Sequence, residues 1–200
     1  MPRPHRFPVF LSVLGALFML NGVLGIQWLF DGAEHFSETA ASWQFATFQR
    51  IYLLLLVALT VLVPGFGELR GRSGRRIPSA VLAVLTGALV LQAGTVFTMA
   101  FVAPFYAEVA PATLDITDGG MFEASMSAVW VTFAVAVIAF GVAVLRSGTL
   151  PRATGILLVV GALITPVLGP VGSILLGTAF VGAGISLRQP SGVLPVTIAG

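Results

Sequence analysis

The chain carries no charged side chain between Arg152 and Arg188. That uncharged run is about twice the minimum length of a membrane-spanning helix, which needs roughly 17–25 mainly apolar residues. Only 9% of all residues are charged, whereas 57% are hydrophobic. Since a soluble domain carries about 25% charged residues and needs a polar surface, the composition excludes a soluble globular protein and a disordered chain. The sequence predicts an all-α, polytopic membrane protein.

The basic residues are distributed as in a membrane protein and not as in a nucleic-acid-binding protein. All 10 of them are Arg, and all except Arg50 flank apolar segments, where such residues set the orientation of the spans. A nucleic-acid-binding domain gathers them on one soluble face, so no nucleic-acid partner is expected. The sequence contains no Cys, and His5 and His35 are its only imidazoles. Disulfides, thiol catalysis, and cysteine or multi-histidine metal sites are therefore not expected.

Six apolar segments are interpreted as membrane spans within a single transmembrane bundle over residues 1–188, followed by a short tail over 189–200. The predicted spans are 9–30, 45–65, 78–103, 121–145, 153–168 and 170–187. Proline tends to end a helix because it removes a backbone hydrogen bond. The second span is therefore expected to end at the turn beginning with Pro64, and the third before Pro104. The first span is longer than the apolar stretch of a cleaved signal peptide, about 7–15 residues, and is interpreted as a retained helix.

The last two predicted spans come from dividing one apolar run. Two prolines and a glycine within Thr165–Pro170 favour a turn there. The alternative is one span followed by a re-entrant segment broken at the same prolines, which would have to be buried in protein. Both polar segments, Asp31–Thr47 and Tyr106–Gly120, are expected to be outer loops, the first with a helical turn or two at the interface.

The charges agree with six spans. All arginines except Arg50 then fall on one side of the membrane, and all acidic residues except Glu68 fall on the other. Basic residues collect in the cytoplasm, so both termini are predicted to be cytoplasmic and the acidic side to face outward. The expected location is the inner, or plasma, membrane. Five spans would leave Arg188 outside.

Two stretches carry a family resemblance. One is Ala100–Glu108, which reads AFVAPFYAE, and the other is Leu145–Arg152, which reads LRSGTLPR and is followed by GILL at Gly155–Leu158. Together they resemble small uncharacterised prokaryotic integral membrane proteins with six helices, of the kind grouped under domains of unknown function. The resemblance implies the six-helix membrane fold and carries no activity to transfer.

Arg50 is the sharpest candidate for a functional residue. Counted from Trp43 at the outer interface, it lies about seven residues, or roughly 10 Å, further into the bilayer. A guanidinium there must snorkel outward or meet an acid. Glu123, at the outer start of the fourth span, is the expected partner, with Asp31 and Glu34 as alternatives. A structural ion pair is favoured over a contact to an anionic ligand and over simple snorkelling.

Two amides, Asn21 and Gln92, lie near the midplane of the first and third spans. An amide at that depth usually hydrogen-bonds to a neighbouring helix, contributing about 0.6–2 kcal/mol, and this packing role is favoured over the lining of a cavity. An outward-facing polar pocket is the functional interpretation, and its other members would be Gln27, Thr95, Thr98, Arg50 and Glu123.

The acidic segment after the first span contains side chains that could ligate a metal ion. On a helix, Asp31, Glu34, His35 and Glu38 would share one face and offer three carboxylates and an imidazole to a divalent ion. Gly32 and the loop position favour a solvated polar turn instead. No metal site is predicted.

No catalytic signature is present: the sequence has no nucleophile elbow, no His-Glu-x-x-His and no phosphate loop. We therefore predict no catalytic residue and no cofactor, and a protein that binds a lipid or small apolar molecule or serves as a subunit of a membrane complex. Its expected partners are membrane lipids and either a second copy of the chain or another membrane subunit. The alternatives are a small transporter using the region of Arg50 and Glu123, and an intramembrane enzyme acting on a lipid or isoprenoid with Glu34, His35 or Glu123 as acid–base groups.

Topology is directly testable with reporter fusions. Fusions after Arg76, Arg152 and Gly200 are expected to report cytoplasm, and fusions near Glu38 and Asp118 to report the outside, because the arginine-rich side stays inside. An outside signal at Gly200 would contradict the six-span prediction and leave five spans or a re-entrant segment.

Overall fold

The computed structural model describes residues 6–29, 35–71, 74–115 and 121–188, and that part of the chain contains helices and no strands. The α-helices are α1 (Phe7–Leu29), α2 (Phe36–Ala41), α3 (Trp43–Glu68), α4 (Ser79–Phe97), α5 (Ala103–Val109), α6 (Met121–Ser147), α7 (Arg152–Ile164) and α8 (Gly169–Arg188). A π-helical turn, Thr98–Val102, connects α4 to α5, and a 3-10 turn, Pro111–Thr113, follows α5. The predicted all-α class is confirmed.

Five helical segments are long and apolar enough to cross a membrane: α1, α3, the segment from α4 to α5, α6 and α8. Helix α7 has only 13 residues, which span about 20 Å at helical rise, whereas the hydrocarbon core of a bilayer is about 30 Å thick.

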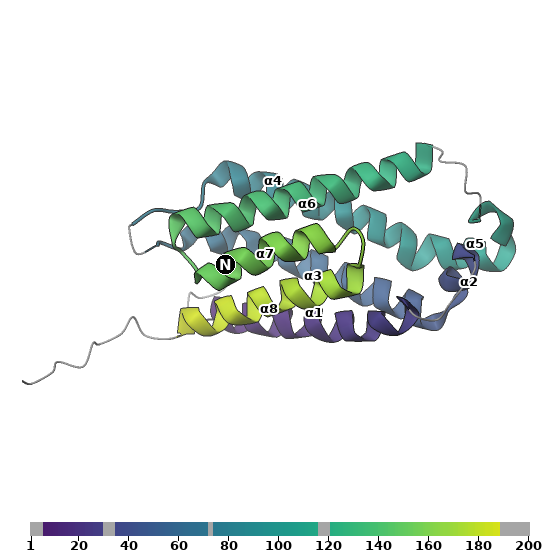
Figure 1. Cartoon of the computed structure of the whole chain (residues 1–200), viewed down its shortest axis with the longest axis horizontal. Helices are drawn as coiled ribbons and strands as arrows, with labels where there is room; N and C mark the ends of the chain where they lie inside the picture. The colour runs from purple at the N-terminus through teal and green to yellow at the C-terminus, as the bar shows by residue number, and fades with distance from the viewer. Residues whose placement is uncertain (1–5, 30–34, 72–73, 116–120, 189–200) are drawn as a thin grey trace, which may run out of the picture.

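Six of the helices lie side by side along the long axis of the molecule (Figure 1) and pack into a closed ring. Each packs against the next in the order α1, α3, α4, α6, α7 and α8, and α8 packs back against α1. Neighbours are antiparallel: in α1 and α3, for example, Phe7 meets Phe66 with ring centroids 5.3 Å apart, and Phe18 meets Tyr52 at 6.0 Å. The ring has a terminal end, where α1 begins and α8 ends, and an opposite end covered by α2 and α5, called here the α2–α5 end.

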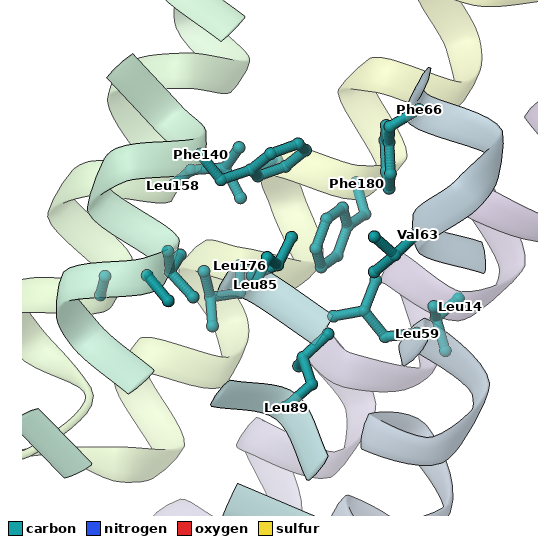
Figure 2. Close-up of a cluster of buried hydrophobic side chains, with 14 of the residues drawn as sticks. Leu14, Leu59, Val63, Phe66, Leu85, Leu89, Phe140, Leu158, Leu176 and Phe180 are labelled. Carbon is teal, nitrogen blue, oxygen red and sulfur yellow. The ribbon is translucent and has the colours of Figure 1, made fainter. Parts of the chain in front are cut away.

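The axis of the ring is filled with apolar side chains, among them Leu85, Phe140 and Phe180 (Figure 2). All six helices contribute to the lining of a cavity of about 10 Å³, and the lining residues include Phe18, Leu56, Leu85, Phe133, Leu158 and Phe180. A volume of that size is at the lower limit for one water molecule, and an apolar lining offers that water no hydrogen bond. The Phe66 and Phe140 rings pack edge-on against each other there, with their centroids 5.0 Å apart. We call this filled region the axial plug.

Glycine closes the ring between the first and last helices. A Cβ atom on Gly15 would lie 2.6 Å from the carbonyl oxygen of Gly177, and one on Gly22 would lie 2.5 Å from that of Pro170. Both separations are shorter than real carbon contacts, so a side chain at either position would push the helices apart. Small residues allow helices in a bilayer to approach this closely and gain van der Waals contact, which is what holds them together where no water is displaced.

The hairpin of α7 and α8 turns back before its neighbours end (Figure 1). Gly155 of α7 packs against Gly141 of α6, and α7 ends about nine residues later, at Ile164, which pairs it with the region of Thr132. The first part of α6 therefore has no α7 beside it. Near the α2–α5 end the ring consists of α1, α3, α4 and α6 alone.

The second predicted span differs from the structure at its end. Helix α3 continues through Pro64 to Glu68 and does not stop at the proline. Pro64 is exposed, whereas Phe66 is fully buried against Phe7 and Phe140. Packing of that last turn outweighs the one hydrogen bond that proline removes, and the ring of a surface proline is tolerated in an apolar helix.

The third predicted span also continues past its expected end. The helical path runs through Pro104 to Val109 by way of the π-helical turn at Thr98–Val102. Proline cannot donate the regular backbone bond and its ring clashes with the carbonyl one turn earlier. The wider π turn directly before Pro104 accommodates this irregularity without ending the helix.

Ring closure predicts an asymmetry between two glycine substitutions. Gly15→Ala places a methyl group against the α8 backbone and is expected to lower the free energy of unfolding by about 1–3 kcal/mol. Gly87→Ala is the matched control, because a Cβ there meets nothing within 4 Å and alanine favours the helix by up to about 1 kcal/mol. Thermal unfolding in detergent measures both. Equal behaviour of the two variants would contradict the close α1–α8 packing.

Candidate functional site

Helices α1, α3 and α4 each place one polar side chain in a stripe of core residues. In α1 the stripe recurs every three or four positions, as a buried helix face does: it consists of Leu11, Leu14, Phe18, Asn21 and Gly25. Tyr52 and Gln92 occupy core positions of α3 and α4. The exposed fractions of these three side chains are 1% for Asn21, 3% for Tyr52 and 0% for Gln92. We call the three residues the polar layer.

Asn21 and Tyr52 lie at the same depth on adjacent helices. The Phe18 ring packs edge-on against the Tyr52 ring at 6.0 Å, and a Cβ on Gly25 would lie 2.6 Å from the Phe48 ring. Because α1 and α3 are antiparallel, Asn21, which lies between Phe18 and Gly25, faces the turn of α3 that carries Tyr52.

Gln92 lies deeper in the bundle, toward the terminal end. Gly67 of α3 packs near Leu82 of α4, and Arg50 lies over Phe101. These two contacts pair Gln92 with the region of α3 about six residues, or roughly 9 Å, from Tyr52. The polar layer is therefore staggered along the axis and reaches the edge of the axial plug.

No polar atom of the layer has a hydrogen-bond partner. The orphaned atoms are the amide nitrogen and oxygen of Asn21, those of Gln92, and the hydroxyl oxygen of Tyr52. An unsatisfied buried group costs about 1–3 kcal/mol. The interhelical bonds expected of Asn21 and Gln92 are therefore not formed, and the packing role favoured from the sequence lacks the contact that it needs.

The hydroxyl groups of the bundle behave differently. Thr60 donates to the carbonyl oxygen of Leu56 at 2.8 Å, and Thr86 donates to that of Leu82 at 2.9 Å. Threonine satisfies itself on its own helix in this way. The amide groups of Asn21 and Gln92 and the hydroxyl group of Tyr52 make no such bond.

Sequence reasoning did not select Tyr52. Its ring belongs to the apolar stripe of α3: the Phe48 ring stacks on it at 5.9 Å with 12° between the planes, and the Phe18 ring meets it edge-on. The signal that could have found it is a lone tyrosine at core spacing in an apolar span, since a buried tyrosine hydroxyl normally has a partner. The two phenylalanines hold the ring and so fix the position of the hydroxyl.

Arg50 lies at the protein surface, with its guanidinium carbon 5.3 Å from the centre of the Phe101 ring. This is a cation–π contact between α3 and the π-helical turn. The side chain of Glu123 and all of Asp31 and Glu34 lie outside the described residues, so the ion pair of Arg50 stays a prediction.

The remaining predicted site residues do not gather in one place in the part of the chain that the structure describes. Thr95 and Thr98 are half-buried, and Thr98 donates to the carbonyl oxygen of Gly94 on its own helix. His35 and Glu38 are exposed at α2, and no group of three metal-ligating side chains is found among the described residues. The side chain of Gln27 lies outside them.

A carboxylate secures the α2–α5 end. Ser37 donates its backbone N–H to Asp115 Oδ1 at 2.8 Å and its hydroxyl to Oδ2 at 2.6 Å. These bonds, the side-chain one first, lower the pKa of Asp115, because they favour the ionised form. The negative charge lies at the start of α2, where the helix dipole also favours it. The loop after α5 is thereby tied to α2.

Comparison of the chain with protein-family models found no match. No curated protein and no solved structure matches it either. The resemblance to small six-helix prokaryotic membrane proteins stays a prediction.

The contacts of Arg50 are expected to appear as coupling energies in detergent unfolding experiments. Arg50→Ala and Phe101→Leu should each destabilise the protein, and the double variant should lose less than the sum by about 0.5–1 kcal/mol. Glu123→Gln is expected to lose part of its effect once Arg50 is replaced, because a water-accessible ion pair contributes up to about 1 kcal/mol. Phe105→Leu, an exposed phenylalanine on α5, is the control and should be additive with Arg50→Ala. Additivity in either of the first two pairs would mean that its residues do not meet.

Proposed function

We propose that the chain is a multi-pass integral membrane protein that binds a lipid or another small, largely apolar molecule through the polar layer. The observation that carries the proposal is the burial of Asn21, Tyr52 and Gln92 with no hydrogen-bond partner for any of their polar atoms. A ligand with matching polar atoms would remove a cost of about 1–3 kcal/mol per group.

The apolar character of the remaining core supports the same proposal. Leucine at position 21 or 92 would fill similar space without an orphaned amide, and replacement of buried polar groups by apolar ones of similar shape is often neutral or stabilising. The polar layer thus lowers the stability of the unliganded bundle. Such a loss is expected where a core also serves as a binding site.

For the topology we propose six crossings, with α7 as a short fifth crossing and both termini in the cytoplasm of a cell bounded by its plasma membrane. The antiparallel pairing of α1 with α8 supports this, because Gly184 near the end of α8 packs against Pro8 and Ser12 near the start of α1. The positive-inside rule then assigns the terminal end to the cytoplasm. The α2–α5 end is the outer end of the molecule under this proposal.

A binding role is favoured over transport and over catalysis. Transport through the ring would need a polar path, whereas the axial plug is lined by apolar side chains of all six helices. Within the described residues, the polar layer holds amides and a phenol, and His35 lies outside it on the surface.

Stability and ligand retention are expected to move in opposite directions. Tyr52→Phe and the double variant Asn21→Leu/Gln92→Leu should keep or raise the unfolding temperature of the delipidated protein in detergent, because each removes orphaned polar atoms. Both should retain less of the compound that co-purifies with the unmodified protein, as measured by solvent extraction and mass spectrometry. Thr60→Val, which removes a hydroxyl satisfied within α3, is the matched control and should retain the compound.

The opposite pattern would contradict the proposal. If the polar layer only holds helices together, each substitution should destabilise the protein by about 0.6–2 kcal/mol and leave retention unchanged. The absence of any retained compound from the unmodified protein would count equally against a binding function.

A further inference from the structure

The polar layer is chemically suited to an uncharged oxygen-bearing group. Asn21 and Gln92 each offer two N–H donors and one carbonyl acceptor, and Tyr52 offers a hydroxyl. Among the described residues, the helix stripes that surround the layer contain apolar side chains and no charged one. An ionised phosphate or carboxylate would be buried without a counter-charge, at a cost that no hydrogen bond to a neutral amide offsets.

A ligand cannot reach the layer from the terminal end of the ring. Phe18, Phe133 and Phe180 are each at least 96% buried and lie on the terminal side of Asn21 and Tyr52, around the axial plug. Side chains in such a core are close-packed, and the cavity that these three residues help to line has a volume of about 10 Å³. An access route must therefore lie on the side of α2 and α5 or between helices.

The α7–α8 hairpin turns at the depth of the polar layer. A Cβ on Gly22 would lie 2.5 Å from the carbonyl oxygen of Pro170, and one on Gly25 would lie 2.9 Å from the Pro170 ring. Asn21 precedes Gly22 and points into the core, so the first turn of α8 lies beside the layer. Beyond that depth α1 continues to Leu29 without α8 beside it (Figure 1).

The tip of the hairpin is compatible with contact to lipid chains. The Thr165 N–H and hydroxyl both donate to the carbonyl oxygen of Gly161, at 2.9 and 2.7 Å, and the Leu168 N–H donates to that of Ile164 at 2.8 Å. Pro166 has no N–H to satisfy. Irregular backbone is tolerated at membrane depth when its polar groups are used in this way.

Apolar and small side chains lie on the surface around the hairpin tip. Val167 and Leu163 of the hairpin are 79% and 61% exposed. Beyond the end of α7, the start of α6 exposes Ala124 and Ala128. These small side chains and the exposed residues of the hairpin tip are the surfaces against which an acyl or isoprenoid chain would lie.

We infer that the ligand of the polar layer is a neutral amphiphile whose head group presents a carbonyl or hydroxyl oxygen, and that it enters sideways from the outer half of the bilayer, over the tip of the α7–α8 hairpin between α1 and α6. The inference rests on the proposed function and specifies its ligand class. Its head group accepts from or donates to Asn21 and Tyr52, and its apolar tail lies over Val167.

A probe series tests the ligand class. Decylubiquinone presents carbonyl oxygens, farnesol a hydroxyl, dodecyl phosphate an ionised group and dodecane no oxygen. Each is added to the delipidated protein in an uncharged detergent, and the dissociation constant is obtained from the rise in unfolding temperature. Binding is expected from decylubiquinone, from farnesol or from both, and this result distinguishes a quinone from an alcohol. Asn21→Leu/Gln92→Leu should weaken it roughly tenfold or more, whereas Thr60→Val should not.

Because the sequence contains no Cys, a single introduced cysteine can be labelled specifically to test the route of entry. Val167→Cys is modified with pyrene maleimide in detergent, and the dissociation constant of the best probe is measured before and after. Val61→Cys is the control, because Val61 on α3 is 74% exposed, nearly as much as Val167. Modification at position 167 should weaken binding at least about tenfold, and modification at position 61 should leave it unchanged.

Failure of this inference can be told apart from failure of the proposed function. Equal or tighter binding of dodecyl phosphate or dodecane, or equal effects of the two modified cysteines, would overturn the inferred ligand class or route while leaving a binding protein. If no probe binds, the neutral oxygen-bearing class is overturned. If, in addition, the unmodified protein retains no compound on purification, the proposed function fails as well.

Discussion

The fold depends on the close approach of its first and last helices. Gly15 and Gly22 of α1 lie against the backbone carbonyls of Gly177 and Pro170 in α8. No hydrophobic effect drives helices together inside a bilayer, so backbone proximity and the van der Waals contact it permits must supply the attraction. Without this contact the chain would be a row of antiparallel hairpins. With it, the row closes into a ring whose axis can be filled by phenylalanine and leucine.

Closure also determines where polar groups lie. Pro170 is held against Gly22 and Gly25, which fixes the depth at which α8 begins and therefore the depth at which the hairpin turns. Asn21 lies at that same depth on the core face of α1. Hydrogen-bonding groups without partners thus lie at the depth where the α7–α8 hairpin turns and the ring narrows from six helices to four. The proposed binding site is placed there because both features occur at the same depth.

Much of the architecture could be predicted from the sequence because apolar segment length and proline position are local properties. The all-α class and most helix positions followed from them, as did the helical turn α2 in the first polar loop. The errors came where packing outweighed local preference: burial of Phe66 carries α3 past Pro64, and a π turn carries the next helix past Pro104. The sequence identifies Asn21 and Gln92 as costly groups at membrane depth, whereas Tyr52 was not singled out.

The sequence by itself determined that the chain forms long apolar helices, where its basic and acidic residues divide, and which polar side chains fall within the spans. Each of these is read along one segment, since hydropathy and helical periodicity involve residues near one another in the chain. Tertiary structure alone decided that α1 meets α8, that α7 ends short of its neighbours' length, and that the polar layer has no internal partner. Those features depend on contacts between residues far apart in sequence, because a side chain's hydrogen-bond partners and burial exist only once the helices have packed.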